Sequence, residues 1–360
     1  MNRTLYHRYR SLAFSGGLAL VLAASCSKSK SDEKVEATKV ETKAKAPDEK
    51  PVVDPKVAEA EAAAAAKKIE DTKKVAEAIK ELEAELATER ERWTEAVVTA
   101  VKTLAATDHA NAKDALTALL ASPHRKPEHV ARDAHRHPLE TLQFFGVALD
   151  THVVEMGVGR GWYTEILAPL VAKNGHFVGG AYDPEGPLDS MRTVYAMRQK
   201  AFFGNSEELY GKAKTFDLGA EELVIGEADS ADVVLAIREM HNWQRRDSLD
   251  AKLKAIVSVL KPGGTFGVVQ HRAKADAKAE ESAELGYLPE AWVIAKVEAA
   301  GLKLVEKSEI NANEKDTKDY EDGVWTLPPS LSKDDTDRAK YEAIGESDRM
   351  TLRFEKPKAE

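Results

Sequence analysis

Residues 155–161 alternate an acidic residue and three glycines with other residues, and this is the densest chemical pattern in the chain. The four positions are Glu155, Gly157, Gly159 and Gly161. An apolar run typical of a buried strand precedes them, and an amphipathic helical pattern follows. In a strand, turn and helix of this kind, glycine allows positive φ and close approach of a ligand, and the helix start offers free N–H groups. The pattern therefore predicts a ligand-binding turn.

The ligand of this turn is not expected to be a dinucleotide. A dinucleotide fingerprint would have its third glycine at the position of Trp162, whose bulky indole argues against a nicotinamide site. Asp183 closes the second apolar run, twenty-two residues beyond Gly161. A carboxylate there can accept hydrogen bonds from both hydroxyls of a ribose. We therefore expect the turn and Asp183 to form one cofactor-binding site.

Polar and aromatic residues follow two later apolar runs. His241, Asn242 and Trp243 come after one run, and His271 and Arg272 come after the next. Because carboxyl ends of parallel strands meet at one edge of a sheet, both histidines would face one crevice. His241 is the better candidate for a base or a substrate hydrogen-bond donor; alternatively, it caps a helix or bonds a backbone carbonyl. Trp243 either stacks on substrate or packs beneath the loop.

A basic segment precedes the first strand. It contains His124, Arg125, Lys126, His129, Arg132, His135, Arg136 and His137. Four histidines suggest a metal ion, but no carboxylate-rich motif of firm ligand spacing accompanies them, so we predict no metal site. Some of these cations are expected to face the carboxylate of a cofactor or an anionic substrate. The alternative is a solvated basic face.

Apolar runs and helical patterns alternate after about residue 110. The expected strands are 153–156, 177–182, 231–237, 265–270, 302–310 and 349–355. This alternation predicts an α/β fold, a Rossmann-like, mostly parallel sheet of seven strands with helices on both faces. Residues 311–331 are polar and then rich in Trp and Pro, which predicts a lid over the crevice, with disorder as the alternative.

The order of the motifs resembles that of class I (Rossmann-like) S-adenosylmethionine-dependent methyltransferases over about residues 130–356. The glycine turn, Asp183, strand 231–237 and Lys261-Pro262-Gly263-Gly264 carry this resemblance. Other segments look like a bacterial family of predicted methyltransferases that are often exported: 132–133, 136–138, 161–169, 241–243, 267–272, 308–313, 323–329 and 344–351. The resemblance implies S-adenosylmethionine as cofactor and methyl transfer as reaction, and it supplies no substrate.

The amino terminus has the pattern of a secretory signal. Basic residues 3–10 precede an apolar stretch, 12–24, that is too short for a comfortable membrane span. Residues 22–26 resemble a bacterial lipobox, with Ala23 where Leu is usual. We therefore expect a signal peptide at 1–25 and a lipid on Cys26. These features would tether the protein to a membrane of the cell envelope, facing the periplasm or the exterior.

Three further regions are expected after the signal. Residues 26–56 have almost no large apolar side chain and predict a disordered tether. Residues 57–106 lack Gly and Pro and predict one long amphipathic helix, and residues 110–360 form the methyltransferase-like domain. The apolar stripe from Ile79 to Trp93 allows a coiled coil and self-association, although Glu89 interrupts it. The alternative is a helix folded back on its own domain.

Composition excludes several classes of protein. The 360 residues are 43% hydrophobic and 31% charged, unlike collagen, a multi-span membrane protein or a wholly disordered chain. With 52 basic and 61 acidic residues the net charge is -9, which argues against a nucleic-acid partner. A single cysteine permits no intramolecular disulfide and no multi-cysteine zinc site.

Two classes of function remain. The first is an exported, membrane-tethered methyltransferase acting on a small molecule or an envelope component. The second is a catalytically silent, ligand-binding lipoprotein that keeps the fold. A weaker third possibility is an envelope-spacing protein built around the long helix.

Overall fold

The computed structural model describes residues 55–332 and 337–358. The predicted signal peptide, Cys26 and the tether as far as residue 54 lie outside these residues. Residues 56–360 form one compact unit, so the helical region and the region after residue 110 are not separate domains. Of the helices described, none is both long and apolar enough to cross a membrane.

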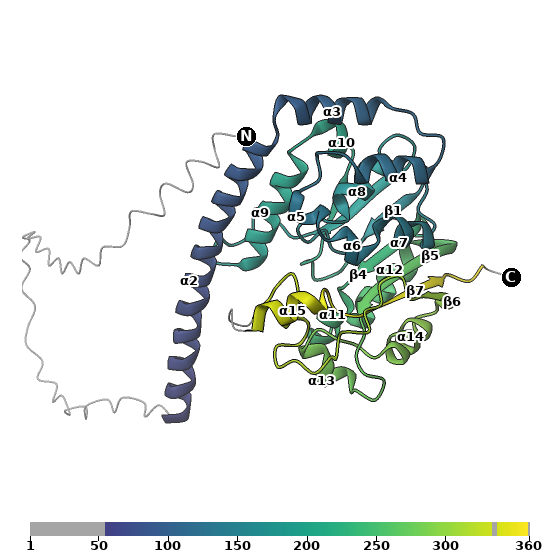
Figure 1. Cartoon of the computed structure of the whole chain (residues 1–360). Coiled ribbons are helices and arrows are strands. Elements are labelled where there is room, and N and C mark those ends of the chain that lie inside the picture. The colour runs from purple at the N-terminus through teal and green to yellow at the C-terminus, as the bar shows by residue number, and fades with distance from the viewer. Residues whose placement is uncertain (1–54, 333–336, 359–360) are drawn as a thin grey trace, which may run out of the picture. The chain divides into compact units, whose positions relative to one another are not determined.

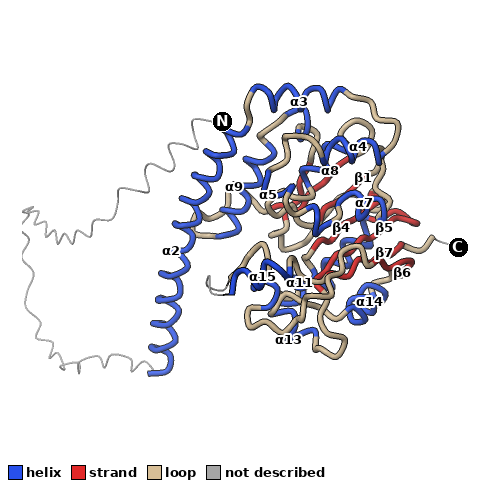
Figure 2. The backbone as a smooth tube through the Cα atoms, viewed as in Figure 1, coloured by secondary structure: helices blue, strands red, loops and turns tan. Residues whose placement is uncertain are grey.

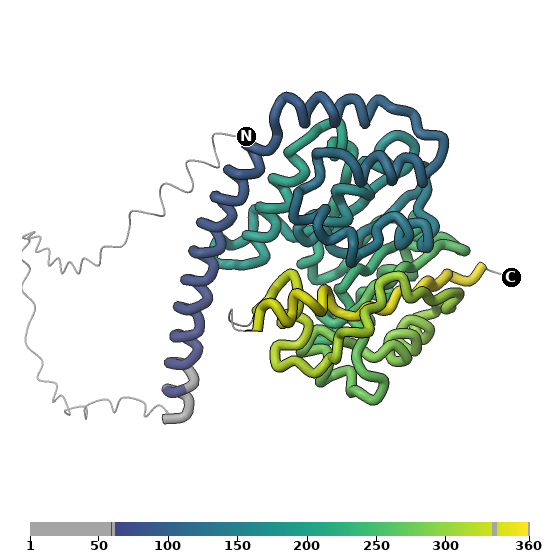
Figure 3. The backbone as a smooth tube through the Cα atoms, viewed as in Figure 1, coloured from purple at the N-terminus to yellow at the C-terminus, as the bar shows by residue number. Residues whose placement is uncertain are grey.

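A seven-stranded sheet with the order β3-β2-β1-β4-β5-β7-β6 occupies the centre of this unit. Its strands are β1 (His152–Glu155), β2 (His176–Ala181), β3 (Lys214–Asp217), β4 (Ala231–Ile237), β5 (Leu260–His271), β6 (Lys303–Ser308) and β7 (Arg349–Glu355). Only β7 runs antiparallel to its neighbours; drawn in yellow in Figure 3, it inserts between β5 and β6. The expected α/β, Rossmann-like and mostly parallel sheet is confirmed.

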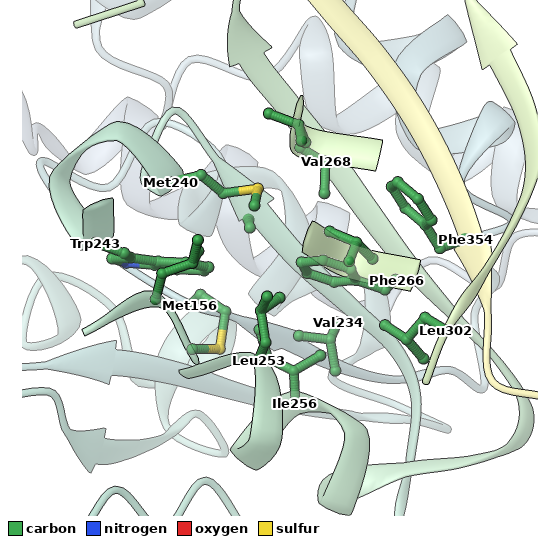
Figure 4. Packing of buried hydrophobic residues seen from close by; sticks show 14 of the residues in the cluster. Met156, Val234, Met240, Trp243, Leu253, Ile256, Phe266, Val268, Leu302 and Phe354 are labelled. Atoms are coloured by element: carbon green, nitrogen blue, oxygen red, sulfur yellow. The ribbon is translucent and has the colours of Figure 1, made fainter. Parts of the chain in front are cut away.

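Successive side chains of β4 alternate between two apolar cores, as a strand buried on both faces requires. Val233 and Leu235 face one core, and Val234 and Ala236 face the other. Helices cover both faces of the sheet, as Figure 2 shows. The first core includes helices α4 (Ala112–Leu120), α7 (Pro138–Phe144), α8 (Thr164–Val171) and α10 (Glu207–Tyr210). The second, part of which is seen in Figure 4, includes α11 (Met240–Arg245), α12 (Leu249–Val259), α13 (Ala279–Glu284) and α14 (Glu290–Ala299).

The structure has further helical elements. They are α5 (Pro127–Val130), α6 (Asp133–Arg136), α9 (Met191–Phe203), the 3-10 helix η1 (Gly323–Thr326) and α15 (Arg338–Ile344). The Trp- and Pro-rich segment 311–331 docks on the domain. Leu327 is fully buried, and the Tyr287 hydroxyl donates to Asp316 at 3.0 Å. The segment is therefore packed rather than disordered, and its role as a lid stays a prediction.

The single long helix expected over 57–106 is wrong: the structure has two helices, α2 (Pro55–Arg92) and α3 (Glu95–Ala106). The chain breaks because Thr94 adopts an extended conformation and caps α3, its hydroxyl accepting from the Val97 N–H at 3.4 Å. Arg92 holds the break against the domain by donating to the carbonyls of Pro123 and His124, at 2.9 and 2.7 Å.

The apolar residues of α2 pack against another helix of the same chain. Val75 and Leu82 are buried against Val194 of α9, which runs alongside α2 in Figure 1. Earlier in the helix, Ile69 is 59% exposed. The helix therefore folds back on its own domain over this stretch, and self-association remains a prediction for its exposed part.

Substituting Leu82→Ala is expected to release α2 from α9, because it removes a buried side chain from the centre of their contact. Such a change typically costs about 2–4 kcal/mol. Trypsin should then cleave the lysines of α2 faster than in the wild type, as followed by mass spectrometry.

Ile69→Ala is the matched control, since an exposed substitution usually changes stability by no more than about 0.5 kcal/mol. Equal cleavage rates in the Leu82→Ala variant and the wild type would contradict the packing of α2 on α9.

Candidate active site

The glycine turn connects the end of β1 to the start of α8, and each glycine meets a different requirement. Gly159 and Gly161 have φ of +55° and +89°, where side chains are strained. A Cβ on Gly161 would also lie 2.8 Å from the Phe202 ring. A Cβ on Gly157 would lie 3.1 Å from Glu239 Oε1. Gly159 is exposed, and nothing lies within 4 Å of its Cβ position, so the turn is open to a ligand there.

Two carboxyl groups flank Gly157. Glu155 is buried at the end of β1 and accepts a hydrogen bond from Thr164 Oγ1 at 2.6 Å. Burial raises the pKa of Glu155 to about 8, against the effect of this hydrogen bond and with a contribution from Glu239. Burial likewise raises the pKa of Glu239 to about 7, although Arg238 and Arg246 oppose it. The carboxyl groups of Glu155 and Glu239 therefore change charge near neutral pH.

Asp183 lies at the same edge of the sheet as the turn. It follows β2, which pairs in parallel with β1 through Glu155 and Gly179. The Asp183 side chain is exposed, and its Oδ1 accepts from the Glu185 N–H at 2.9 Å. The structure thus places the predicted residues at one edge of the sheet, and cofactor binding by them stays a prediction.

Helix α2 contributes to the turn, which the sequence pattern did not predict. A pocket there is lined by Gly159 and Arg160 of the turn, by Glu85 of α2 and by residues of α9. Glu85 forms ion pairs with Arg198 at 2.8 Å and with Arg160 at 3.9 Å. The α9 side chain of Gln199 donates to the Gly159 carbonyl at 3.2 Å. The two helices therefore hold the outer side of the turn.

His241 and His271 lie side by side, with ring centroids 5.7 Å apart. His241 Nδ1 lies 3.4 Å from Gln270 Oε1, and His271 Nδ1 lies 2.5 Å from Ser347 Oγ. Burial lowers the pKa of His241 to about 4, opposed by Gln270 and reinforced by Arg238. Burial and the neighbouring His241 also lower the pKa of His271 well below its ordinary value. Both imidazoles are therefore neutral at physiological pH.

The other three candidates from the sequence differ in their surroundings. Asn242 is partly buried beside His241. Trp243 is 3% exposed and lies in the core, which is the packing alternative considered above (Figure 4). Arg272 binds three carboxylates, of which Glu290 is 3.1 Å and Glu309 2.7 Å away. Trp325, which the sequence assigned only to a lid, lies 6.2 Å from the His241 ring.

Most of the basic segment is buried, so a solvated basic face is wrong for it. Two buried carboxylates account for this. Glu165 of α8 binds Arg125 Nε at 2.8 Å and His129 Nδ1 at 2.9 Å. Glu346 binds Arg132 Nε at 2.6 Å and Arg136 Nε at 3.2 Å. In residues 55–332 and 337–358, no three His, Cys, Asp or Glu side chains are grouped to hold a metal ion.

No family model and no curated protein matches the sequence. The chain is distantly similar to solved structures. A SAM dependent methyltransferase from Aquifex aeolicus is 14% identical, with a TM-score of 0.42, over 64% of this chain and 94% of the other. A SAM-dependent methyltransferase from Methanosarcina mazei is 12% identical, with a TM-score of 0.40, over 61% and 97%. A cyclase is 14% identical, with a TM-score of 0.42, over 63% and 82%. The fold itself is established by the strand order.

The pKa of Glu155 makes stability depend on pH. Because its pKa rises from 4.5 to about 8 on folding, its contribution is full below pH 4.5 and is lost as pH rises through 8. Glu155→Gln is therefore expected to weaken the fall in unfolding temperature between pH 6 and pH 9, as measured by circular dichroism. Glu239, whose pKa burial also raises, contributes to the slope that remains.

The exposed Glu222 supplies the control, since Glu222→Gln should keep the wild-type pH dependence. If Glu155→Gln lost unfolding temperature with pH as steeply as the wild type, the buried carboxyl would not be the titrating group.

Proposed function

We propose that this chain is an S-adenosylmethionine-dependent methyltransferase. The observation that carries the proposal is the junction of β1 and β4. The chain runs from β1 outward to β2 and β3, then returns to place β4 on the other side of β1. In doubly wound α/β sheets, ligands bind at the carboxyl ends of strands where the order reverses in this way. The glycine turn follows β1 and Glu239 follows β4, so both belong to this junction.

The charge of the junction suits a cationic cofactor. Glu155 and Glu239 flank the turn, and ionised carboxylates there would repel the pyrophosphate of a dinucleotide. The sulfonium of S-adenosylmethionine is a cation, and a nearby cation favours the ionised form of a carboxyl group. The open backbone at Gly159 and the exposed carboxylate of Asp183 fit the remaining parts of this cofactor. These residues would hold it together with Gly157 and Gly161.

When bound, S-adenosylmethionine supplies a methyl group already activated by the sulfonium charge. The protein then has mainly to hold the acceptor atom in line with that methyl group. His241 is neutral at physiological pH, and with a pKa of about 4 it is a weak base. Its role is therefore to orient the acceptor through a hydrogen bond, with Gln270 positioning the ring. His271, Asn242 and Arg272 stay candidates for shaping this acceptor side.

We further propose that the protein is exported and tethered in the bacterial cell envelope through a lipid on Cys26, and acts on a small molecule or an envelope component. The alternative is a catalytically silent, ligand-binding lipoprotein. Export favours this alternative, because S-adenosylmethionine is made in the cytoplasm. The intact acid, glycines and Asp183 support cofactor binding, since a silent relative would be free to lose them.

The full-length chain, purified in a nonionic detergent, should bind S-adenosylmethionine in a calorimetric titration. Asp183→Ala should weaken binding roughly 10- to 100-fold, because it removes hydrogen bonds to a charged acceptor. Asp189→Ala is the matched control: it removes an exposed carboxylate from the same segment and should leave the affinity unchanged. Gly159→Val should abolish binding by placing a side chain in the open part of the turn.

Absence of cofactor binding at millimolar concentration, or unchanged affinity in Asp183→Ala, would rule out the assigned site. Binding without release of S-adenosylhomocysteine in the presence of envelope extracts would favour the silent lipoprotein over the enzyme.

A separate experiment addresses the tether. Wild-type protein expressed in bacteria should incorporate labelled fatty acid and partition into detergent, whereas Cys26→Ala should remain an unlipidated precursor. Equal labelling of the two proteins would refute lipid attachment at Cys26.

A further inference from the structure

Four arginines from three parts of the chain gather around one buried carboxylate. Arg132 and Arg136 come from the segment before β1, Arg349 begins β7, and Glu346 binds all three, with Arg349 Nη1 at 2.7 Å. Arg238, which directly follows β4, belongs to the same group, since its charge interacts with those of Glu346, Arg132 and Arg349. One carboxylate cannot neutralise four guanidinium groups, so the cluster carries excess positive charge.

The excess charge leaves hydrogen-bond donors without acceptors. Arg136 is 1% exposed, and neither its Nη1 nor its Nη2 has a partner among the described residues. The same holds for Arg132 Nη2, Arg238 Nε, Arg349 Nε and His137 Nδ1. A buried donor without an acceptor normally costs about 1–3 kcal/mol, and more when it is charged. So many in one place indicate that an acceptor from outside the described residues belongs there.

The electrostatics of the cluster agree with this geometry. Burial lowers the pKa of Arg136 well below its ordinary value, and the charge of Arg238 lowers it further. Burial lowers the pKa of Arg238 to about 10, although Glu346 opposes this. Burial by itself would raise the pKa of Glu346, but Arg136, Arg349 and Arg132 together hold it well below its ordinary range. An added anion would relieve the repulsion among these cations.

The shape of the free donors indicates the kind of anion. The Trp162 ring stacks on the Arg136 guanidinium, 4.7 Å from ring centroid to Cζ, and Glu346 accepts from Nε. The two terminal nitrogens therefore remain as a fixed fork. A planar fork of this type matches two oxygens of a carboxylate or a phosphate.

The cluster also lies beside the proposed acceptor side of the active site. Arg349 is the direct partner of His271 across β5 and β7. Arg238, which follows β4, donates its backbone N–H to the carbonyl of Val269 in β5, two residues before His271. An anionic group held by the arginines would place the rest of its molecule near the two histidines.

We propose that the arginine cluster of Arg132, Arg136, Arg238 and Arg349 binds a carboxylate or phosphate group of the methyl acceptor, so that the substrate is an anion. This inference rests on the proposed methyltransferase function. The carboxylate of the cofactor has the same chemistry, and the experiment below separates the two sources.

The test measures binding of inorganic phosphate to the full-length chain at constant ionic strength, by thermal unfolding with chloride as the balancing anion. Phosphate should raise the unfolding temperature of the wild type saturably. Arg136→Gln and Arg238→Gln should each weaken the apparent phosphate affinity roughly tenfold or more. Without phosphate, Arg238→Gln should unfold at the wild-type temperature or above, because it removes a cation from a repelling cluster and breaks no side-chain hydrogen bond seen among the described residues.

Arg125→Gln is the matched control. Arg125 is equally buried, but Glu165 and Asp133 pair with its guanidinium. This variant should lose stability and keep the phosphate response. A wild type that phosphate stabilises no more than chloride, or an Arg238→Gln variant with the wild-type response, would overturn the proposal.

A second arm uses S-adenosylhomocysteine and 5′-methylthioadenosine, which lacks the amino-acid part. Simultaneous binding of phosphate and S-adenosylhomocysteine supports a substrate site. Competition between them, together with an Arg136→Gln variant that loses affinity only for S-adenosylhomocysteine, would assign the cluster to the cofactor and overturn the proposal. If no nucleoside binds, the methyltransferase proposal fails, whereas the phosphate titration still decides whether the cluster is an anion site.

Discussion

Gly157 lies between the buried Glu155 and the half-buried Glu239, and the site depends on the space that its missing side chain leaves. The register of β1 and β4 pairs Glu155 with Leu235, so the residues that follow both strands meet at one point. A Cβ on Gly157 would press on Glu239 at 3.1 Å. With glycine there, both acids approach the turn, no arginine of the described part of the chain forms an ion pair with either, and burial raises the pKa of each. The result is a turn whose charge can respond to a cationic ligand.

Adjacent residues after β4 divide this end of the sheet by charge. Arg238 has a left-handed backbone conformation, with φ of 60°, which is strained for a residue other than glycine. The chain turns there, so that Arg238 joins the arginines around Glu346 while Glu239 faces Gly157. Two residues that are adjacent in the sequence, Arg238 and Glu239, therefore belong to a cationic group and an acidic group. The neutral pair His241 and His271 belongs to the same edge, and its low pKa values reflect both burial and the arginines.

Glu165 and Glu346 explain why a segment so rich in cations lies inside the molecule. Glu165 is 1% exposed on α8 and holds Arg125 and His129, while Glu346 holds Arg132 and Arg136. These contacts fix α5 and α6 over the end of the sheet. Helix α2 then closes the outer side of the turn through Glu85 and Arg198. The region before β1 is thus part of the site rather than a spacer in front of it.

The sequence by itself determined the parts that depend on local patterns. The glycine turn, Asp183 after the second strand and six of the strands could be predicted, because apolar runs and glycine spacing are local signals. Strand β3 had no such signal: three of its four residues are exposed, and only Phe216 is buried. The helix break has a local element in the cap at Thr94, but the contacts that hold it against the domain come from carbonyls of residues 123 and 124, about thirty positions away.

Only the tertiary structure decided how the charged residues are used. The sequence shows a basic segment, but Glu346 lies 210 positions from Arg136, and no spacing rule relates them. The same holds for Arg238 and Arg349, which enter the cluster from the ends of β4 and β7. Trp243 could not be assigned to core or substrate until its neighbours were known. Long-range pairing and burial set the charge state and partners of a side chain, and these follow from the packed sheet rather than from residue type.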